Sequence, residues 1–289
     1  MIRLLMTAIS ILLPVHSSLS AAASAVIGKV VLETGSTPGP WRLSVGPEGA
    51  VFVLDRGTAQ LYRVDPASGK TIWRTDGSES GEPFVDPVWI SRPDGFFIFL
   101  TDRGLRRVWK IDYRGELRGS IDLPFAADPV ALELAQGGQM ALYDRAASLV
   151  WLLDDSGRPL WSFAPGEGRK SAEPAAVSLS PDGDRLYFLW RPEGEVTSLS
   201  LFGKRSQFRV TTLPAKETAR FAAASVGGRE LFCCLAADGP LLFDPLSGKS
   251  SRIEIEEGPV WDVRAAGSGL YLLAGKPLTL WLVKLENGD

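Results

Sequence analysis

Short apolar runs separated by polar turns make up most of the chain. In one stretch the runs cover residues 88–92, 96–101, 107–112 and 116–123, and Asp, Arg and Gly fill most of the gaps between them. Runs of this length bounded by turn residues predict β-strands, and Gly favours the tight reversals that join antiparallel strands. The pattern therefore predicts a unit of four short antiparallel strands.

This unit recurs six times along the chain, at intervals of about 40 to 47 residues. The copies begin at Pro40, Pro87, Pro129, Pro174, Ala219 and Pro259. Repeats of a four-stranded unit are typical of a β-propeller, an all-β ring in which each repeat forms one blade. We therefore predict one six-bladed β-propeller domain over residues 26–289.

The last repeat contains only three strand candidates, at residues 260–265, 269–273 and 278–285. An unassigned apolar run at residues 29–34 precedes the first repeat. Pairing of this run with the last repeat would complete the sixth blade and remove two exposed strand edges. We expect the N-terminal strand to close the ring in this way.

Residues 1–25 have the features of a secretory signal peptide. Arg3 lies near the start, an apolar stretch continues to Leu13, and small residues lead up to Ala25. Pro14 and His16 interrupt the apolar run before it reaches the roughly 20 residues that span a bilayer. We therefore predict cleavage near Ala25 and export of a protein that does not span the membrane, to the periplasm or the extracellular space.

The composition argues against several kinds of chemistry. The chain has 31 basic and 34 acidic residues with the two signs interspersed, which argues against a nucleic-acid binder. Its one histidine, His16, lies inside the predicted signal peptide. The mature protein would then lack the imidazole of catalytic triads, histidine-ligated zinc and histidine-ligated haem. Cys233 and Cys234 are adjacent in an apolar run, so we expect buried thiols without a disulfide between them.

The second repeat carries a family resemblance. From Pro87 to Arg103 it reads proline, apolar strand, Asp-Gly turn, apolar strand and Asp, and this order is similar to an NHL repeat. The resemblance covers all six repeats and is close in the first three and in residues 180–183 of the fourth. It implies a six-bladed propeller, a fold that scaffolds, sensors and binding modules share with some lyases and lactonases. The lyases of this superfamily depend on histidines that the mature chain would lack.

Four of the repeats carry an arginine at an equivalent position, directly after the second strand. Propeller geometry brings the loop after each second strand and the loop that leads into the next blade to one face of the ring. We predict that this face holds the ligand or partner site, formed by Asp55, Arg56, Asp102, Arg103, Asp144, Arg145, Trp190 and Arg191. Guanidinium groups recognise carboxylates and phosphates through paired hydrogen bonds. Alternatively, each Asp caps a turn and each Arg pairs with a neighbouring Asp, which would make an internal belt of charges.

These observations predict an exported, monomeric, non-catalytic binding or scaffolding module without a cofactor or metal. Its partner would be a protein, with an acidic surface or an anionic ligand as the matching chemistry. The alternative is a metal-dependent hydrolase, because the resemblance implies that gluconolactonase-like propellers hold a divalent metal in the central channel. The acids on the predicted face are interpreted as ordinary loop residues that match no compact metal motif: Glu79, Glu82, Asp86, Asp128 and Glu173.

Overall fold

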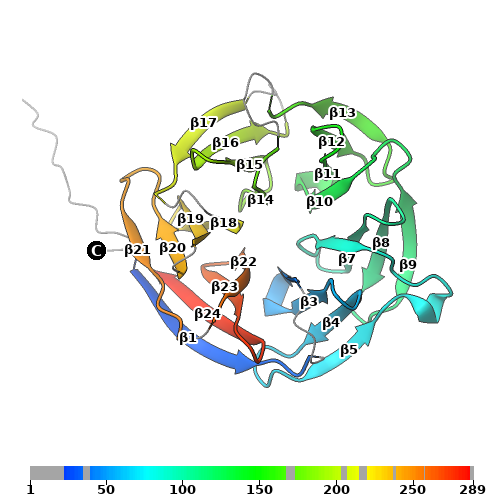
Figure 1. Ribbon diagram of the computed structural model, residues 1–289, viewed down its shortest axis with the longest axis horizontal. Coiled ribbons are helices and arrows are strands. Elements are labelled where there is room, and N and C mark those ends of the chain that lie inside the picture. Colours follow the sequence, from blue (N-terminus) through cyan, green and yellow to red (C-terminus); the bar gives the residue numbers. More distant parts are fainter. Residues whose placement is uncertain are drawn as a thin grey trace, which may run out of the picture.

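The computed structural model describes residues 23–34, 40–166, 173–202, 207–214, 220–236, 239–256 and 258–286. Six four-stranded antiparallel sheets stand around a central axis, which confirms the predicted six-bladed propeller (Figure 1). Helix in this part of the chain is limited to 3-10 turns of three residues. Residues 1–22, which hold most of the predicted signal peptide, lie outside the described residues.

Blades 1 to 5 each follow the order of the sequence from the axis outward. Blade 1 contains β2 (Trp41–Val45), β3 (Val51–Asp55), β4 (Gln60–Val64) and β5 (Thr71–Thr75). Blade 2 contains β6 (Pro87–Ile90), β7 (Phe97–Asp102), β8 (Arg107–Asp112) and β9 (Leu117–Asp122). Blade 3 contains β10 (Pro129–Leu134), β11 (Met140–Asp144), β12 (Leu149–Leu153) and β13 (Pro159–Phe163). Blade 4 contains β14 (Ala176–Leu179), β15 (Arg185–Trp190), β16 (Glu195–Ser200) and β17 (Gln207–Thr212). Blade 5 contains β18 (Arg220–Val226), β19 (Arg229–Ala236), β20 (Gly239–Phe243) and β21 (Ser250–Arg252).

Blade 6 joins the two ends of the described chain. It contains β22 (Val260–Ala266), β23 (Gly269–Ala274) and β24 (Thr279–Glu286), and β1 (Ala23–Val31) is its outermost strand. β1 runs antiparallel to β24, with Ala23 opposite Glu286 and Val31 opposite Thr279. The predicted closure is confirmed, although β1 starts and ends earlier than the predicted residues 29–34.

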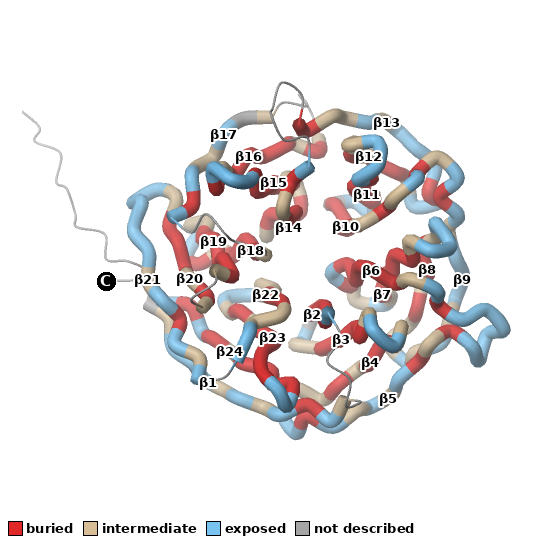
Figure 2. The backbone as a smooth tube through the Cα atoms, viewed as in Figure 1, coloured by how far each residue is buried: buried red, intermediate tan, exposed pale blue. Residues whose placement is uncertain are grey.

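Apolar side chains fill the spaces between neighbouring blades. Figure 2 shows that the buried residues concentrate in the inner strands and the exposed residues in the outermost strands and loops. On β19, Cys233 and Cys234 are both buried free thiols, and they belong to the core clusters on opposite faces of their blade. Burial raises the pKa of Cys233 to about 12, so this thiol stays protonated and unreactive. The expectation of two buried cysteines is confirmed.

The six innermost strands, β2, β6, β10, β14, β18 and β22, surround the central axis (Figure 1). The loops after the second strands meet the loops that lead into the next blades on one face of the ring, here called the upper face. Two backbone hydrogen bonds show this contact, from the Arg103 N–H to the Asp86 carbonyl and from the Arg145 N–H to the Asp128 carbonyl, each 2.9 Å long. The first strands and these loops together position the candidate site.

Candidate functional site

The Asp that ends the second strand is a structural residue in blades 2 and 3. Asp102 is fully buried and accepts hydrogen bonds from the N–H groups of Val85, Asp86 and Leu105 at 2.8, 3.1 and 3.1 Å. Asp144 is equally buried and accepts hydrogen bonds from the N–H groups of Ala127 and Asp128, in the loop that leads into blade 3. Asp55 caps its own turn in blade 1 through Gly57 and Thr58. These carboxylates hold the loops in place through backbone hydrogen bonds.

The arginines that directly follow Asp102 and Asp144 in the sequence pair with acidic residues of the loops that lead into blades 2 and 3. The guanidinium of Arg103 binds Asp86 through Nε and NH2, both at 2.6 Å, and the Nε of Arg145 binds Asp128 at 2.6 Å. Longer contacts of 3.9 Å join Arg56 to Asp86 and Arg103 to Asp128. The upper face therefore carries an alternating belt of arginines and carboxylates around blades 1 to 3. This belt fixes the direction of the outer guanidinium groups.

Two of the residues predicted for this face lie apart from the belt. Trp190 is 1% exposed, and its indole N–H donates to the hydroxyl of Thr197 at 2.8 Å. It is a core residue because its ring points into the blade. Arg191 is exposed, but it does not line the pocket described next. Of the four repeated arginines, Arg56, Arg103 and Arg145 line the pocket and Arg191 does not.

A pocket of about 210 Å³ opens within the belt, at the upper mouth of the central channel. Five arginines line it: Arg42, Arg56, Arg103, Arg145 and Arg220. Its apolar wall consists of Val88, Trp89, Val130, Ala131, Pro174, Ala175, Ala176 and Val177. Tyr143 and Glu173 complete the polar lining. The pocket thus brings together side chains from blades 1 to 5 and from the loop that leads into blade 4.

Arg42 on β2 forms the floor of this pocket. It is only 7% exposed, its Nε donates to the carbonyl of Val88 at 3.3 Å, and its guanidinium lies over the Trp89 ring at 5.1 Å. Burial and, to a smaller extent, the charge of Arg220 lower the pKa of Arg42 to about 9, although Asp262 opposes the shift. No carboxylate of the described chain lies within 4.0 Å of this guanidinium. Arg42 is therefore a buried cation without a direct counter-charge, an arrangement that favours an anionic ligand.

Tyr143 and Glu173 are the pocket residues suited to proton transfer. Tyr143 is 3% exposed, and its hydroxyl lacks a well-formed hydrogen bond among the described residues. Burial raises the pKa of Tyr143, with Glu173 adding to the shift, so the hydroxyl remains a neutral donor at physiological pH. Glu173 is more exposed and lies 3.9 Å from the NH1 of Arg145. Tyr143 therefore offers a neutral hydroxyl donor to a ligand in this basic pocket.

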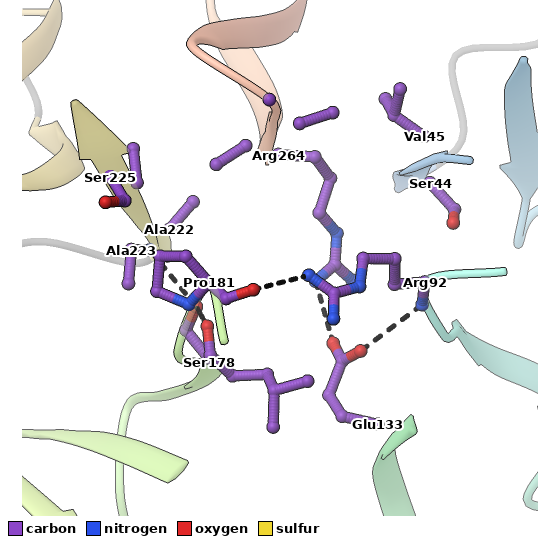
Figure 3. A pocket seen from close by; sticks show the side chains of 15 residues that line it. Ser44, Val45, Arg92, Glu133, Ser178, Pro181, Ala222, Ala223, Ser225 and Arg264 are labelled. Atoms are coloured by element: carbon purple, nitrogen blue, oxygen red, sulfur yellow. Dashed lines mark hydrogen bonds and ion pairs between the residues drawn. The ribbon is translucent and has the colours of Figure 1, made fainter. Parts of the chain in front are cut away.

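The lower side of the channel is closed by a buried ion pair. The NH1 of Arg264 on β22 binds the Oε1 of Glu133 on β10 at 2.8 Å, across the axis of the ring (Figure 3). Arg264 also donates to the carbonyls of Leu43 and Ile90, and its guanidinium lies over Trp89 at 4.6 Å. A smaller cavity of about 170 Å³ lies on this side, lined largely by small residues of β18 and β22. The Arg264–Glu133 ion pair thus lies between the blades on the side of the channel away from the arginine pocket.

Sequence reasoning missed the innermost residues of the site. Arg42, Tyr143 and Arg220 lie in or beside apolar runs that read as core strands. The available signal was a charged residue inside a first strand, since these strands surround a channel and not another sheet. Arg42, Glu133, Asp262 and Arg264 all share this property.

Solved structures of lyases share this fold. The chain is similar to a virginiamycin B lyase from Staphylococcus aureus, with 16% identity, a TM-score of 0.58 and coverage of 84% of this chain and 79% of the other. A streptogramin B lyase structure gives 14% identity and a TM-score of 0.59, with 92% and 98% of the two chains covered. No family model and no curated protein matches the sequence.

These neighbours correct the predicted function. The non-catalytic scaffold was inferred from the missing histidine and from the many propellers that only bind partners. The solved structures named above are lyases, and they contradict the prediction of a non-catalytic scaffold. A catalytically inactive form of the Staphylococcus aureus lyase carries a histidine-to-alanine substitution. The described part of this chain contains no histidine.

The channel does not support the metal-dependent alternative either. Its acids Glu133 and Asp262 contact arginine or backbone groups, namely Arg264 and the N–H of Leu43. Over the described ranges, no three Cys, Asp or Glu side chains gather as metal ligands would.

None of the helices in this part of the chain is long and apolar enough to cross a membrane.

Proposed function

We propose that this chain is an enzyme that acts on a small anionic molecule in the arginine pocket of the upper face. The observation that carries the proposal is Arg42, a buried cation on the pocket floor with no carboxylate among the described residues within 4.0 Å. Four further arginines line the same pocket. An anion in the pocket would relieve the repulsion among these groups and accept hydrogen bonds from the terminal nitrogens of Arg42 and Arg56.

The other polar groups of the pocket suit proton abstraction next to a carbonyl. Glu173 accepts a proton from carbon, and the electron pair of that C–H bond moves onto the carbonyl oxygen. The neutral Tyr143 hydroxyl and the Arg145 guanidinium donate hydrogen bonds to this oxygen as it becomes negative. Return of the electron pair expels a leaving group from the neighbouring carbon, and the leaving group takes the proton from Glu173. This is a lyase reaction, the class to which the neighbours of the fold belong.

The test is turnover of a panel of small carboxylates and phosphate esters, each followed by proton NMR in deuterium oxide. Elimination or exchange of a carbon-bound proton for deuterium in one of them would support the proposal. We expect Tyr143→Phe and Glu173→Gln to abolish that change while anion binding persists. An unchanged rate in both variants would place the chemistry elsewhere, and the absence of any anion binding would refute the proposal altogether.

Two further features belong to this proposal. Membership among NHL-type propellers is supported by Asp102 and Asp144, the repeat residues that hold the incoming loops. Export is supported by the signal-like residues 1–25. N-terminal sequencing of the protein from its native host would test export, since a start near Val26 is expected and an intact Met1 would contradict it.

A further inference from the structure

The floor of the arginine pocket is built for more than one negative charge. Arg42 uses its Nε for the carbonyl of Val88, and Arg56 uses its Nε for the carbonyl of Pro87 at 3.4 Å. In both, the two terminal NH₂ groups make no hydrogen bond with the described residues. Two guanidinium forks are therefore available to one ligand.

The nearby carboxylates do not balance these two arginines. Asp86 is bound closely by Arg103 and lies 3.9 Å from Arg56, at the outer limit of an ion pair. Asp262 opposes the lowered pKa of Arg42, yet it is not within 4.0 Å of it, and it accepts a hydrogen bond from the N–H of Leu43. The floor thus holds the charge of Arg42, which has no carboxylate within 4.0 Å among the described residues, and the charge of Arg56, which Asp86 balances only in part.

The underside of the floor is rigid. Trp89 lies beneath the guanidinium groups of both Arg42 and Arg264, at 5.1 and 4.6 Å from the ring centre. Arg264 is itself held by Glu133 and two backbone carbonyls. Arg42 is therefore preorganised, which lowers the entropic cost of binding a ligand.

We infer that the substrate is a phosphate monoester, bound as a dianion between Arg42 and Arg56 with its organic part along the apolar wall of the pocket. This inference rests on the proposed anion pocket. A phosphate monoester offers three oxygens and two negative charges, which match two guanidinium forks better than the single charge of a carboxylate. Val88, Val130 and Val177 provide the apolar wall.

The test compares phenyl phosphate with phenyl sulfate, which has the same shape but one negative charge at every pH used. Calorimetric titrations are made at pH 5.0 and pH 8.0. The second pKa of an aryl phosphate is about 6, so roughly one tenth is dianionic at pH 5. We expect phenyl phosphate to bind about tenfold more tightly than phenyl sulfate at pH 8 and within about twofold at pH 5.

Titration of protein groups near the bound phosphate could also make binding depend on pH, so their effect has to be separated from that of the ligand. They are Arg42 on β2, Arg56, Arg103 and Arg145 on the belt, Arg220 on β18, Tyr143 on β11, Glu173 on its loop and Asp262 on β22. Phenyl sulfate experiences the same groups, so the ratio of the two affinities isolates the titration of the ligand.

Two variants locate the effect. Arg56→Gln, at a partly exposed position, should reduce the affinity for phenyl phosphate about tenfold and bring it near that of phenyl sulfate. Arg158→Gln removes an arginine from an exposed outer turn and should change neither affinity. Equal binding of both ligands at pH 8 would overturn the phosphate inference and leave the anion pocket intact. Binding of neither ligand would overturn both proposals.

Discussion

Replacing Arg42 with Met should make the unliganded protein more stable. At about 1.4 kcal/mol per pH unit, a fall of the Arg42 pKa to about 9 corresponds to a penalty of about 5 kcal/mol for the charged side chain. The substitution also removes the hydrogen bond to Val88 and the stacking on Trp89, worth about 1 kcal/mol and about 1–2 kcal/mol. Met keeps most of the apolar contact of the side chain. We expect a net gain of about 2–3 kcal/mol.

The assay is urea unfolding at pH 7, followed by tryptophan fluorescence and circular dichroism. Arg158→Met, on an exposed turn, is the matched control and should change the free energy of unfolding by less than about 0.5 kcal/mol. The gain in stability should come with loss of function, because Arg42→Met also removes the floor of the anion site. Phenyl phosphate should therefore raise the melting temperature of the wild type and leave that of the variant nearly unchanged.

The pH dependence of unfolding gives a second check that Arg42→Met stabilises the protein. The folded-state pKa of Arg42 lies below its unfolded value, so the penalty is present in full below about pH 9. As the pH rises through 9, the folded protein loses this proton before the unfolded chain does, and the penalty shrinks. The stability advantage of Arg42→Met should therefore decrease above pH 9. A variant less stable than the wild type at pH 7 would refute the reasoning and indicate a hidden counter-charge for Arg42.

Other consequences can be tested separately. Asp102→Ala leaves three backbone N–H groups without their acceptor and should lower the free energy of unfolding by about 3 kcal/mol, against less than about 1 kcal/mol for Asp154→Ala on an exposed turn, both measured in urea. Deleting residues 23–31 exposes the edge of β24 and should abolish the cooperative thermal transition, so an unchanged melting curve would contradict closure by β1. Virginiamycin B should remain intact after incubation with the protein, because the described residues include no histidine. Disappearance of the intact antibiotic in mass spectrometry would contradict this prediction.

The ring could be predicted because its determinants are local. Turn residues such as Gly95, Gly157 and Gly248 adopt a positive φ where a tight turn requires it, and the strands between turns repeat at a regular interval. Closure was predictable because the last repeat lacked a strand. The ends of β1 were not, because its register depends on pairing with β24 and not on its own apolar pattern.

The belt was predictable in part and the pocket was not. The repeated Asp-Arg pairs placed Arg56, Arg103 and Arg145 on one face, and the alternative of turn-capping Asp and paired Arg matches the geometry around Asp102. The charge inside a first strand was the one signal for Arg42, and its surroundings could not be predicted, because Arg220 and Asp262 are distant in sequence and come near it only after the ring closes. Trp190 was misplaced because a large aromatic residue at a strand end reads equally well as core or surface.

The most direct test of the arginine pocket is a crystal structure of the protein with phenyl phosphate. We expect the phosphate oxygens to lie about 3 Å from the terminal guanidinium nitrogens of Arg42 and Arg56, with the phenyl ring against Val130 and Val177. An empty pocket, with the ligand bound only at outer arginines such as Arg158, would contradict the assignment of this pocket as the functional site.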